Sequence, residues 1–167
     1  MNIIPSISAA CFDHDVWIRI TGRGCFECST NLKTYVKMMI EKGYDHYIID
    51  LMDCQQMDST FMGTITGIAQ ELRRKKKETL RVINVSEKNQ QLMENLGLDQ
   101  LFLIQPLSTG RKLPPFLDDR FFCTNPILCE ENEKSIKREL FVSAHKALVS
   151  AHEANAAKFQ NLFDLIC

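Results

Sequence analysis

The sequence lacks the features by which several large classes of protein are recognised. No apolar run approaches the roughly 20 residues that a membrane-spanning helix needs, so we expect no membrane partner. Residues 1–15 lack a basic segment followed by an apolar one, so we also expect no secretory signal. The formal net charge is only −1, and such a chain has no overall field that would draw it to nucleic acid.

Patterns typical of enzymes are missing as well. The chain has no glycine-rich phosphate loop, and no Ser/His/Asp set or carboxylate pair stands at a spacing that catalysis uses. Its seven cysteines are an odd and irregularly spaced set, unlike the disulfide framework of small secreted proteins. We therefore expect a cytoplasmic protein that is not an enzyme and carries no cofactor and no metal.

What the sequence does contain is the composition of an ordinary globular domain. Of its 167 residues, 45% are hydrophobic and 25% are charged, which are usual fractions for a soluble protein. This length suits one domain with a proper core and leaves room for an appendage.

Strand patterns recur through the first 105 residues. Val16, Ile18 and Ile20 alternate with other residues at the two-residue period of a half-buried strand. A segment before them, at 7–12, is expected to add an antiparallel edge strand. Short apolar runs predict buried strands at 47–51, 80–85 and 101–104.

Helix patterns lie between these strands. The first helix is predicted to start at Ser29 and to end at Gly43. A second should begin near Ser59, and a third should follow Ser86 and end at Gly97. Because strands and helices alternate with short connections, we predict an α/β fold in which helices cover a small mixed sheet.

The composition changes after residue 105. Proline and glycine punctuate residues 106–126, which predicts an irregular linker or a strap over the domain. Residues 127–167 contain neither amino acid and predict a helical extension. We therefore divide the chain into a domain at 1–105, a linker at 106–126 and an extension at 127–167.

The extension is too long to lie on this domain as one straight helix. A single helix of that length would span about 55–60 Å, roughly twice the size of a 100-residue domain. It must break and fold back, or part of it must meet another molecule. A stripe of small and apolar residues suits close helix packing and favours a homodimer or another partner contact through 127–167: Ile136, Leu140, Ala144, Ala147, Ala151 and Ala154.

The stretch DLMDCQQMDSTFMG, residues 50–63, leaves a predicted strand and enters a predicted helix. Its pattern D-L-x-x-C-x-x-M-D-S-T-x-M-G resembles the signature of the STAS domain, the family of sulphate transporters and anti-sigma-factor antagonists. The order of elements up to residue 104 is similar to the fold of that family. The later stretch VINVSEKNQQLMENLGLDQLF is similar to its last strand and third helix.

This resemblance implies a function and a set of residues. In bacterial anti-sigma-factor antagonists a serine kinase, which is itself the anti-sigma factor, phosphorylates the hydroxyl that follows the Asp. Here that hydroxyl is Ser59, between Asp58 and Thr60. The unphosphorylated antagonist binds the kinase, phosphorylation releases it, and a serine phosphatase resets the cycle. The contact is expected to centre on the start of the second helix and on the loop 22–28, with these partner-binding residues: Asp58, Thr60, Phe61, Met62, Gly63, Gly24 and Cys25.

The properties of helix N-termini independently support Ser59 as the phosphorylation site. If Asp58 caps the second helix, Ser59 is its first residue and its side chain is expected to point outwards. A phosphate there is compatible with the fold because helix N-termini favour anions. It would still add about −1.5 to −2 charges to a surface that already carries Asp53 and Asp58. A partner face built for a neutral hydroxyl would then lose affinity.

Three alternatives stay open at this point. The Asp-Ser-Thr sequence can be a helix cap and nothing more. Phe61 stands where the family usually has glycine, so the residue can pack inward, change the approach of the kinase or mark a lost switch. The protein can also be a constitutive STAS scaffold, or a subunit associated with a transporter, that is never phosphorylated.

Two further patterns suggest other chemistry. Cys25 and Cys28 form a CxxC pair before a helix, where a lowered thiol pKa would allow redox catalysis. The flanking residues lack the Trp and Pro typical of thioredoxin-like proteins, and no second ligand pair stands at the spacing of a zinc site. The second pattern is the basic run at 73–77, which could suggest nucleic-acid binding. It ends the second predicted helix, however, where solvated cations are favoured.

Overall fold

The structure is a computed structural model that describes residues 3–107, 126–128 and 134–166. The predicted linker at 106–126 therefore lies almost entirely outside the described residues. In chain order the elements are β1 (Ser6–Phe12), β2 (Asp15–Gly24), α1 (Phe26–Glu41), β3 (His46–Asp50), β4 (Cys54–Met57), α2 (Ser59–Arg74), β5 (Arg81–Val85), α3 (Glu87–Asn95), the 3-10 turn η1 (Leu98–Gln100), β6 (Leu103–Pro106), β7 (Pro126–Leu128), α5 (Lys134–Ala151) and α6 (Ala154–Ile166).

The strands form the mixed sheet that the sequence predicts. Their order is β6-β5-β3-β2-β1-β7, and β4 pairs with the end of β2. The pairs β2–β3, β3–β5 and β5–β6 are parallel, whereas β1 runs antiparallel to β2. The predicted edge position of β1 is wrong, because β7 pairs with its other side. β4 and β7 were not predicted: the middle of β4 is polar, and β7 lies where the helical extension was expected to begin, so that expectation is wrong for residues 127–128.

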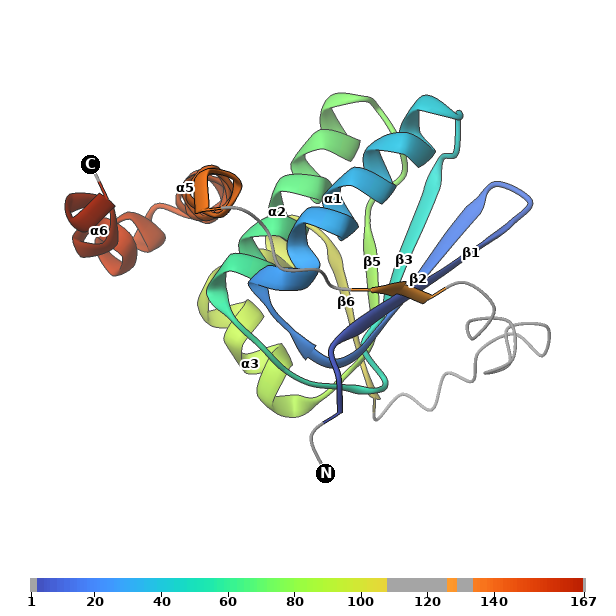
Figure 1. The fold of residues 1–167 in the computed structure, drawn as a ribbon, viewed down its shortest axis with the longest axis horizontal. Helices are drawn as coiled ribbons and strands as arrows, with labels where there is room; N and C mark the ends of the chain where they lie inside the picture. The colour runs from blue at the N-terminus through green and yellow to red at the C-terminus, as the bar shows by residue number, and fades with distance from the viewer. Residues whose placement is uncertain (1–2, 108–125, 129–133, 167) are drawn as a thin grey trace.

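The helices lie in two layers on one side of this sheet (Figure 1). α1, α2 and α3 pack directly on the strands, and α5 and α6 lie beyond α2. Side chains from β2 alternate into the helix-covered core, where they meet apolar residues of the first two helices. The central members of this core include Ile18, Ile49, Leu32, Phe61 and Ile65. The α/β architecture is therefore confirmed.

Most of the predicted helix boundaries are confirmed, and one is wrong. Ser86 caps α3 by accepting a hydrogen bond from the backbone of Asn89, and Gly97 follows it at φ +70°. The first helix instead begins three residues before Ser29, with Cys25 at the N-cap position. The Ser29 hydroxyl donates to the carbonyl of Cys25 at 3.2 Å. Ser29 thus satisfies a carbonyl inside the first turn, a role that competes with capping.

The C-terminal extension breaks and folds back on its own chain. α5 ends at Ala151 and α6 starts at Ala154, so the break lies at residues 152–153. α5 packs chiefly against α2, and Ala144 and Ala147 of the predicted stripe are buried there. The small side chains that suggested a dimer therefore contact the domain of the same chain.

Candidate functional site at the start of helix α2

Asp58 positions the start of α2. Its Oδ1 accepts a hydrogen bond from the backbone N–H of Phe61 at 2.8 Å, which caps the helix. Its Oδ2 accepts from the backbone N–H of Phe26 at 3.1 Å, and the backbone N–H of Asp58 donates to the Gly24 carbonyl at 2.9 Å. One carboxylate therefore holds the first turns of α1 and α2 together. The predicted neighbours Gly24, Cys25, Asp58 and Ser59 are brought to one place.

Ser59 is the first residue of α2, as predicted, and it is partly buried against α5. The Ser59 Oγ lies 3.0 Å from Nε2 of His145 on α5. The Nδ1 of the same ring lies 2.8 Å from the carbonyl oxygen of Phe141. Because a carbonyl can only accept, Nδ1 carries a proton, and in the neutral ring Nε2 then accepts from the serine hydroxyl. The Ser59 side chain therefore points towards α5, a helix that starts 75 residues later in the chain, and it stays partly exposed.

His145 is fully buried on the side of α5 that faces α2. Phe141 and Phe159 flank its ring, with centroid distances of 4.1 and 5.1 Å. The aromatic contacts and the two polar contacts together fix the orientation of the imidazole. His145 therefore acts as a polar anchor of α5 at the start of α2.

The residues after Ser59 point into the core. Phe61 is fully buried, and Thr60 and Met62 are almost so. A Cβ added to Gly24 would lie 2.7–2.9 Å from atoms of the Phe61 ring, so the ring occupies the space that this glycine leaves. Of the readings left open for Phe61, inward packing is the one that the structure supports. These side chains shape the site from beneath rather than forming its surface.

Two glycines of α2 admit α5 at close range. A Cβ on Gly63 would lie 2.6 Å from the carbonyl carbon of Ala144 and closer still to its oxygen, distances that real Cβ atoms do not reach. One turn later, a Cβ on Gly67 would meet only Ala147, at 3.8 Å. Gly63 is therefore a requirement of the present position of α5, whereas Gly67 is not.

Cys25 of the CxxC pair does not have the environment of a redox-active thiol. Burial, followed by a hydrogen bond to Glu27, raises the pKa of the Cys25 thiol from 9.0 to about 11. The Sγ atoms of Cys25 and Cys28 are 3.9 Å apart, so these two residues do not form a disulfide with each other. The lowered pKa that redox catalysis needs is absent at Cys25, which argues against that alternative.

The histidines and acids do not gather into a metal site in the described part of the chain. There, no group of three or more His, Cys, Asp or Glu side chains is placed to hold a metal ion. His145 bonds to Ser59, whereas His152 packs against Gly97 near the end of α3. Within the same ranges, every helix is too short or too polar to cross a bilayer.

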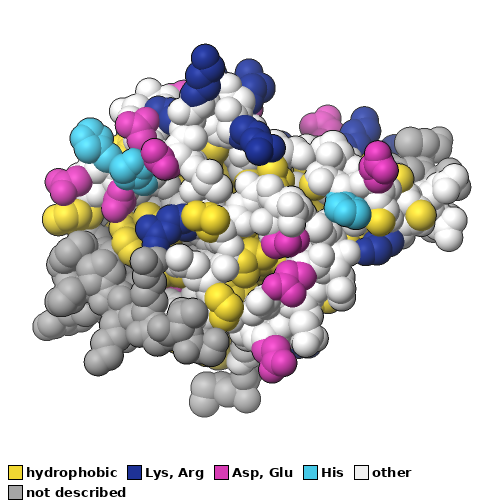
Figure 2. All heavy atoms as spheres, turned by 180° about the vertical axis from the view of Figure 1, so that it is seen from behind, with side chains coloured by type: hydrophobic (Ala, Val, Ile, Leu, Met, Phe, Trp, Pro, Cys, Tyr) yellow, Lys and Arg dark blue, Asp and Glu magenta, His cyan; other side chains and the backbone are white. Residues whose placement is uncertain are grey.

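The basic run at 73–77 lies at the C-terminal end of α2. Figure 2 shows Lys and Arg side chains gathered at one end of the molecule. Arg74 pairs with Glu71 on its own helix, and Lys77 pairs with Asp45 at 2.6 Å. Two of the five cations are therefore engaged in local ion pairs, and the run lies at the opposite end of α2 from Ser59.

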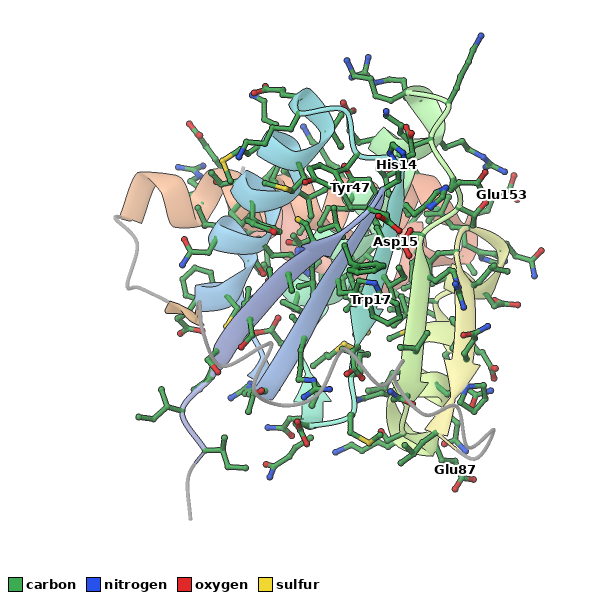
Figure 3. The ribbon with its side chains drawn as sticks, turned by 90° about the vertical axis from the view of Figure 1, so that its right-hand side faces the viewer. His14, Asp15, Trp17, Tyr47, Glu87 and Glu153 are labelled. Atoms are coloured by element: carbon green, nitrogen blue, oxygen red, sulfur yellow. The ribbon has the colours of Figure 1, made fainter. Side chains whose placement is uncertain are left out.

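A second polar cluster lies on the face of the sheet turned away from the helices. The Nε of Arg19 donates to Oδ2 of Asp50 at 2.9 Å, and the Nδ2 of Asn84 donates to Oδ1 at 2.9 Å. All three side chains are buried, and Asn84 has a φ of +55° within β5. Figure 3 looks at the sheet from the side opposite α5 and α6, with Trp17 near the middle of the view. This cluster ties three parallel strands together and is separate from Ser59.

The pairing of Ser59 with His145 was not predicted from the sequence. Two signals pointed to it: the stripe of small residues on α5, and the glycines of α2 at positions i and i+4. Each pattern predicts a close contact between helices, but neither shows which two helices are in contact. Eighty-six residues separate the two side chains, and local periodicity carries no information over that distance.

Known proteins share the fold of this chain. Residues 6–110 match the family model of the STAS domain. TM1081 of Thermotoga maritima, a proposed anti-sigma factor antagonist, is 20% identical and superposes with a TM-score of 0.55 over 62% of this chain and 90% of its own. The anti-sigma factor antagonist SpoIIAA in its unphosphorylated form is 17% identical, with a TM-score of 0.50 over 59% of this chain and 86% of its own. No curated protein matches the chain.

Proposed function

The chain belongs to the STAS-domain family, and from this membership we propose that it is an anti-sigma-factor antagonist controlled by phosphorylation of Ser59. In its unphosphorylated form the protein binds an anti-sigma serine kinase at the start of α2. Transfer of a phosphate to the Ser59 hydroxyl releases that partner, and a serine phosphatase restores the binding form. The protein itself catalyses no reaction and acts in the cytoplasm.

The observation that carries this proposal is the position of Ser59 as the first residue of α2, directly after a capping aspartate. The first N–H groups of a helix point towards its N-terminal end and favour an anion there. A phosphate on Ser59 therefore suits the helix to which it is attached. The phosphate also adds negative charge next to Asp58, and this charge would weaken the binding of a partner that fits the neutral hydroxyl.

The test is intact-mass analysis of the protein purified from its native cell. We expect a fraction of the wild type to carry one phosphate and Ser59→Ala to carry none. Ser143→Ala is the matched control, because it removes an exposed hydroxyl on α5 and should leave the phosphate in place. If no growth condition yields a phosphate, Asp58, Ser59 and Thr60 form a helix cap only, and a constitutive STAS scaffold becomes the better reading.

The homodimer expected through 127–167 remains a prediction. Ala144 and Ala147 already pack against α2 of the same chain, so a dimer would have to use other side chains of α5 and α6. Sedimentation equilibrium of the full chain measures the oligomeric state, and a monomer at high micromolar concentration would contradict the expectation.

A further inference from the structure

Helix α5 lies on the part of α2 to which the proposed function assigns partner binding. We propose that α5 competes with the protein partner for this surface, so that the partner gains full access to Ser59 and to the start of α2 only when α5 leaves α2. This inference rests on the proposed function for the identity of the surface. Its physical content is that the chain alternates between a closed and an open form, and that the partner binds the open one.

α5 makes a polar contact at the N-terminal end of α2. The Ser59 hydroxyl is engaged by Nε2 of His145 at 3.0 Å, and that imidazole is fully buried. A phosphoryl donor needs a free approach to Oγ, and in the closed form His145 of α5 occupies one side of this partly exposed hydroxyl. The hydroxyl that would be modified is therefore the one that holds the covering helix.

α5 also makes an apolar contact along α2. Ala144 lies directly over Gly63, and Ala147 lies over Gly67 one turn later. In the closed form a partner cannot reach the Gly63 backbone, because the Ala144 backbone already lies in contact with it. The same residues that the family signature places at the partner surface are therefore used inside this chain.

Further polar contacts with the domain form at the other end of α5 and on α6. The side-chain amide of Gln70 donates to Oγ of Ser150 at 2.7 Å, and that of Asn155 donates to the Leu96 carbonyl at 2.8 Å. Lys158 donates to the carbonyl of Asn95. These contacts hold the helix pair over the domain from Ser59 to the end of α3, and each uses groups that water can also satisfy.

α5 contacts α2 far more closely than it contacts α1. A cavity of about 540 Å³ lies between α1, α2 and α5, with apolar side chains of Val36, Ile40, Ile68 and Leu140 on its walls. α5 therefore rests on α2 without sealing against α1. In the described part of the chain α5 and α6 follow the last strand and contribute none to the sheet, so the helix pair can open as one unit while the sheet stays folded.

The competition has a quantitative consequence for the partner. When only the open form binds, the apparent dissociation constant is the intrinsic one divided by the open fraction. If one molecule in 100 is open, the partner binds about 100-fold more weakly than it would to an uncovered α2. Any signal that detaches α5 would raise the affinity up to this limit.

A disulfide tether tests the requirement for opening in the full chain. The 3.8 Å between a Cβ on Gly67 and the Cβ of Ala147 matches the spacing that a disulfide spans, so Gly67→Cys with Ala147→Cys should lock α5 down. Accessibility is reported by Ser59→Cys in the same protein. Its alkylation by iodoacetamide is measured by peptide mapping, from pH 7 to 9, so that thiolate content and access are separated.

We expect the oxidised tether to slow alkylation at position 59 by at least about 10-fold relative to the reduced tether. A protein with Ser59→Cys and only one of the two tether cysteines should show no such dependence on reductant. Equal rates in the oxidised and reduced tethered protein would overturn the inference, because access would then not require α5 to move.

A charge on the buried side of α5 tests the opposite direction. In the Ser59→Cys protein, Ala144→Glu should detach α5 and speed alkylation at position 59 by about 10-fold, whereas Ser143→Glu places the same charge on the exposed neighbour and should not. Hydrogen exchange should rise along α5 in Ala144→Glu and remain unchanged in β2 and β3. Equal alkylation rates in the two variants would also overturn the inference.

The native cell separates this inference from the proposed function. With Ser59 intact, Ala144→Glu should carry more phosphate than Ser143→Glu. If the two variants carry equal phosphate although Ala144→Glu is open, α5 does not compete with the kinase and the inference fails. If neither variant nor the wild type carries phosphate although alkylation responds as expected, the proposed function fails and α5 remains shown to be a removable cover.

Discussion

The hydroxyl of Ser59 and the Nε2 of His145 lie 3.0 Å apart, although 86 residues separate them in the chain. Ser59 begins the second helix of the STAS domain, and His145 belongs to a helix outside residues 6–110, the part that matches the family model. The contact therefore joins the fold that the family shares to a segment that the family model does not cover.

The first prediction concerns His145 as the anchor of α5. His145→Ala removes the bond to Ser59 and leaves a cavity between Phe141 and Phe159, so α5 should lose about 2–4 kcal/mol of docking free energy. Hydrogen exchange along α5 measures the loss. His46→Ala is the control, since it breaks a half-exposed contact with Asp15 and should change stability by less than about 1 kcal/mol.

The second prediction compares two glycines of one helix. Gly63→Ala places a methyl group against the backbone of Ala144 and should displace α5, whereas Gly67→Ala has room for its methyl group. Alanine is favoured over glycine in a helix interior by about 1 kcal/mol, so Gly67→Ala should raise the urea midpoint slightly. Gly63→Ala should increase hydrogen exchange along α5. Unchanged exchange in Gly63→Ala would show that α5 does not depend on this close approach.

The third prediction concerns the buried carboxylate of Asp50. It accepts hydrogen bonds from Arg19, Asn84 and the backbone of Met52, and its side chain is fully buried. Asp50→Ala should therefore lower the free energy of unfolding by about 3–5 kcal/mol, as measured by urea denaturation. Asp15→Ala, which breaks only a surface pair, is the matched control. A loss below about 1 kcal/mol in Asp50→Ala would contradict a structural role for the cluster.

The fourth prediction is a pH dependence at Cys25. Burial raises the pKa of this thiol to about 11, and only the thiolate reacts with iodoacetamide. At pH 8 the thiolate fraction should be about 100-fold smaller than for a thiol with a pKa of 9.0. Peptide mapping should show the alkylation rate at Cys25 still rising at pH 10, while glutathione in the same solution has levelled off. A plateau of the Cys25 rate below pH 9 would revive the redox hypothesis.

The α/β fold could be predicted because each long element carries its own period and its own ends. Val16, Ile18 and Ile20 alternate within one strand, and Ser86 and Gly97 enclose one helix. Asp58 was correctly assigned as a cap from its place between a strand and a helix. Ser29 was assigned wrongly, because a serine before an apolar stripe looks the same whether it caps a helix or bonds back inside the first turn.

The surroundings of Ser59 could not be predicted in the same way. A stripe such as Ala144 and Ala147 predicts that a helix packs closely on something, but the identity of that surface depends on the tertiary structure. The sequence therefore left open whether the extension meets its own domain or another molecule. The rise in the Cys25 pKa likewise depends on burial, which the local CxxC pattern does not determine.

The attachment of β7 has a consequence for any partner in solution. β7 pairs with β1, and only the five residues 129–133 separate it from α5. Because so few residues connect α5 to β7, α5 stays near α2 after it detaches. Its effective concentration at the α2 surface is then about a millimolar. A partner in solution can displace α5 only if its affinity for α2 outweighs this effective concentration. Rebinding of α5 is intramolecular, so its rate does not change when the protein is diluted.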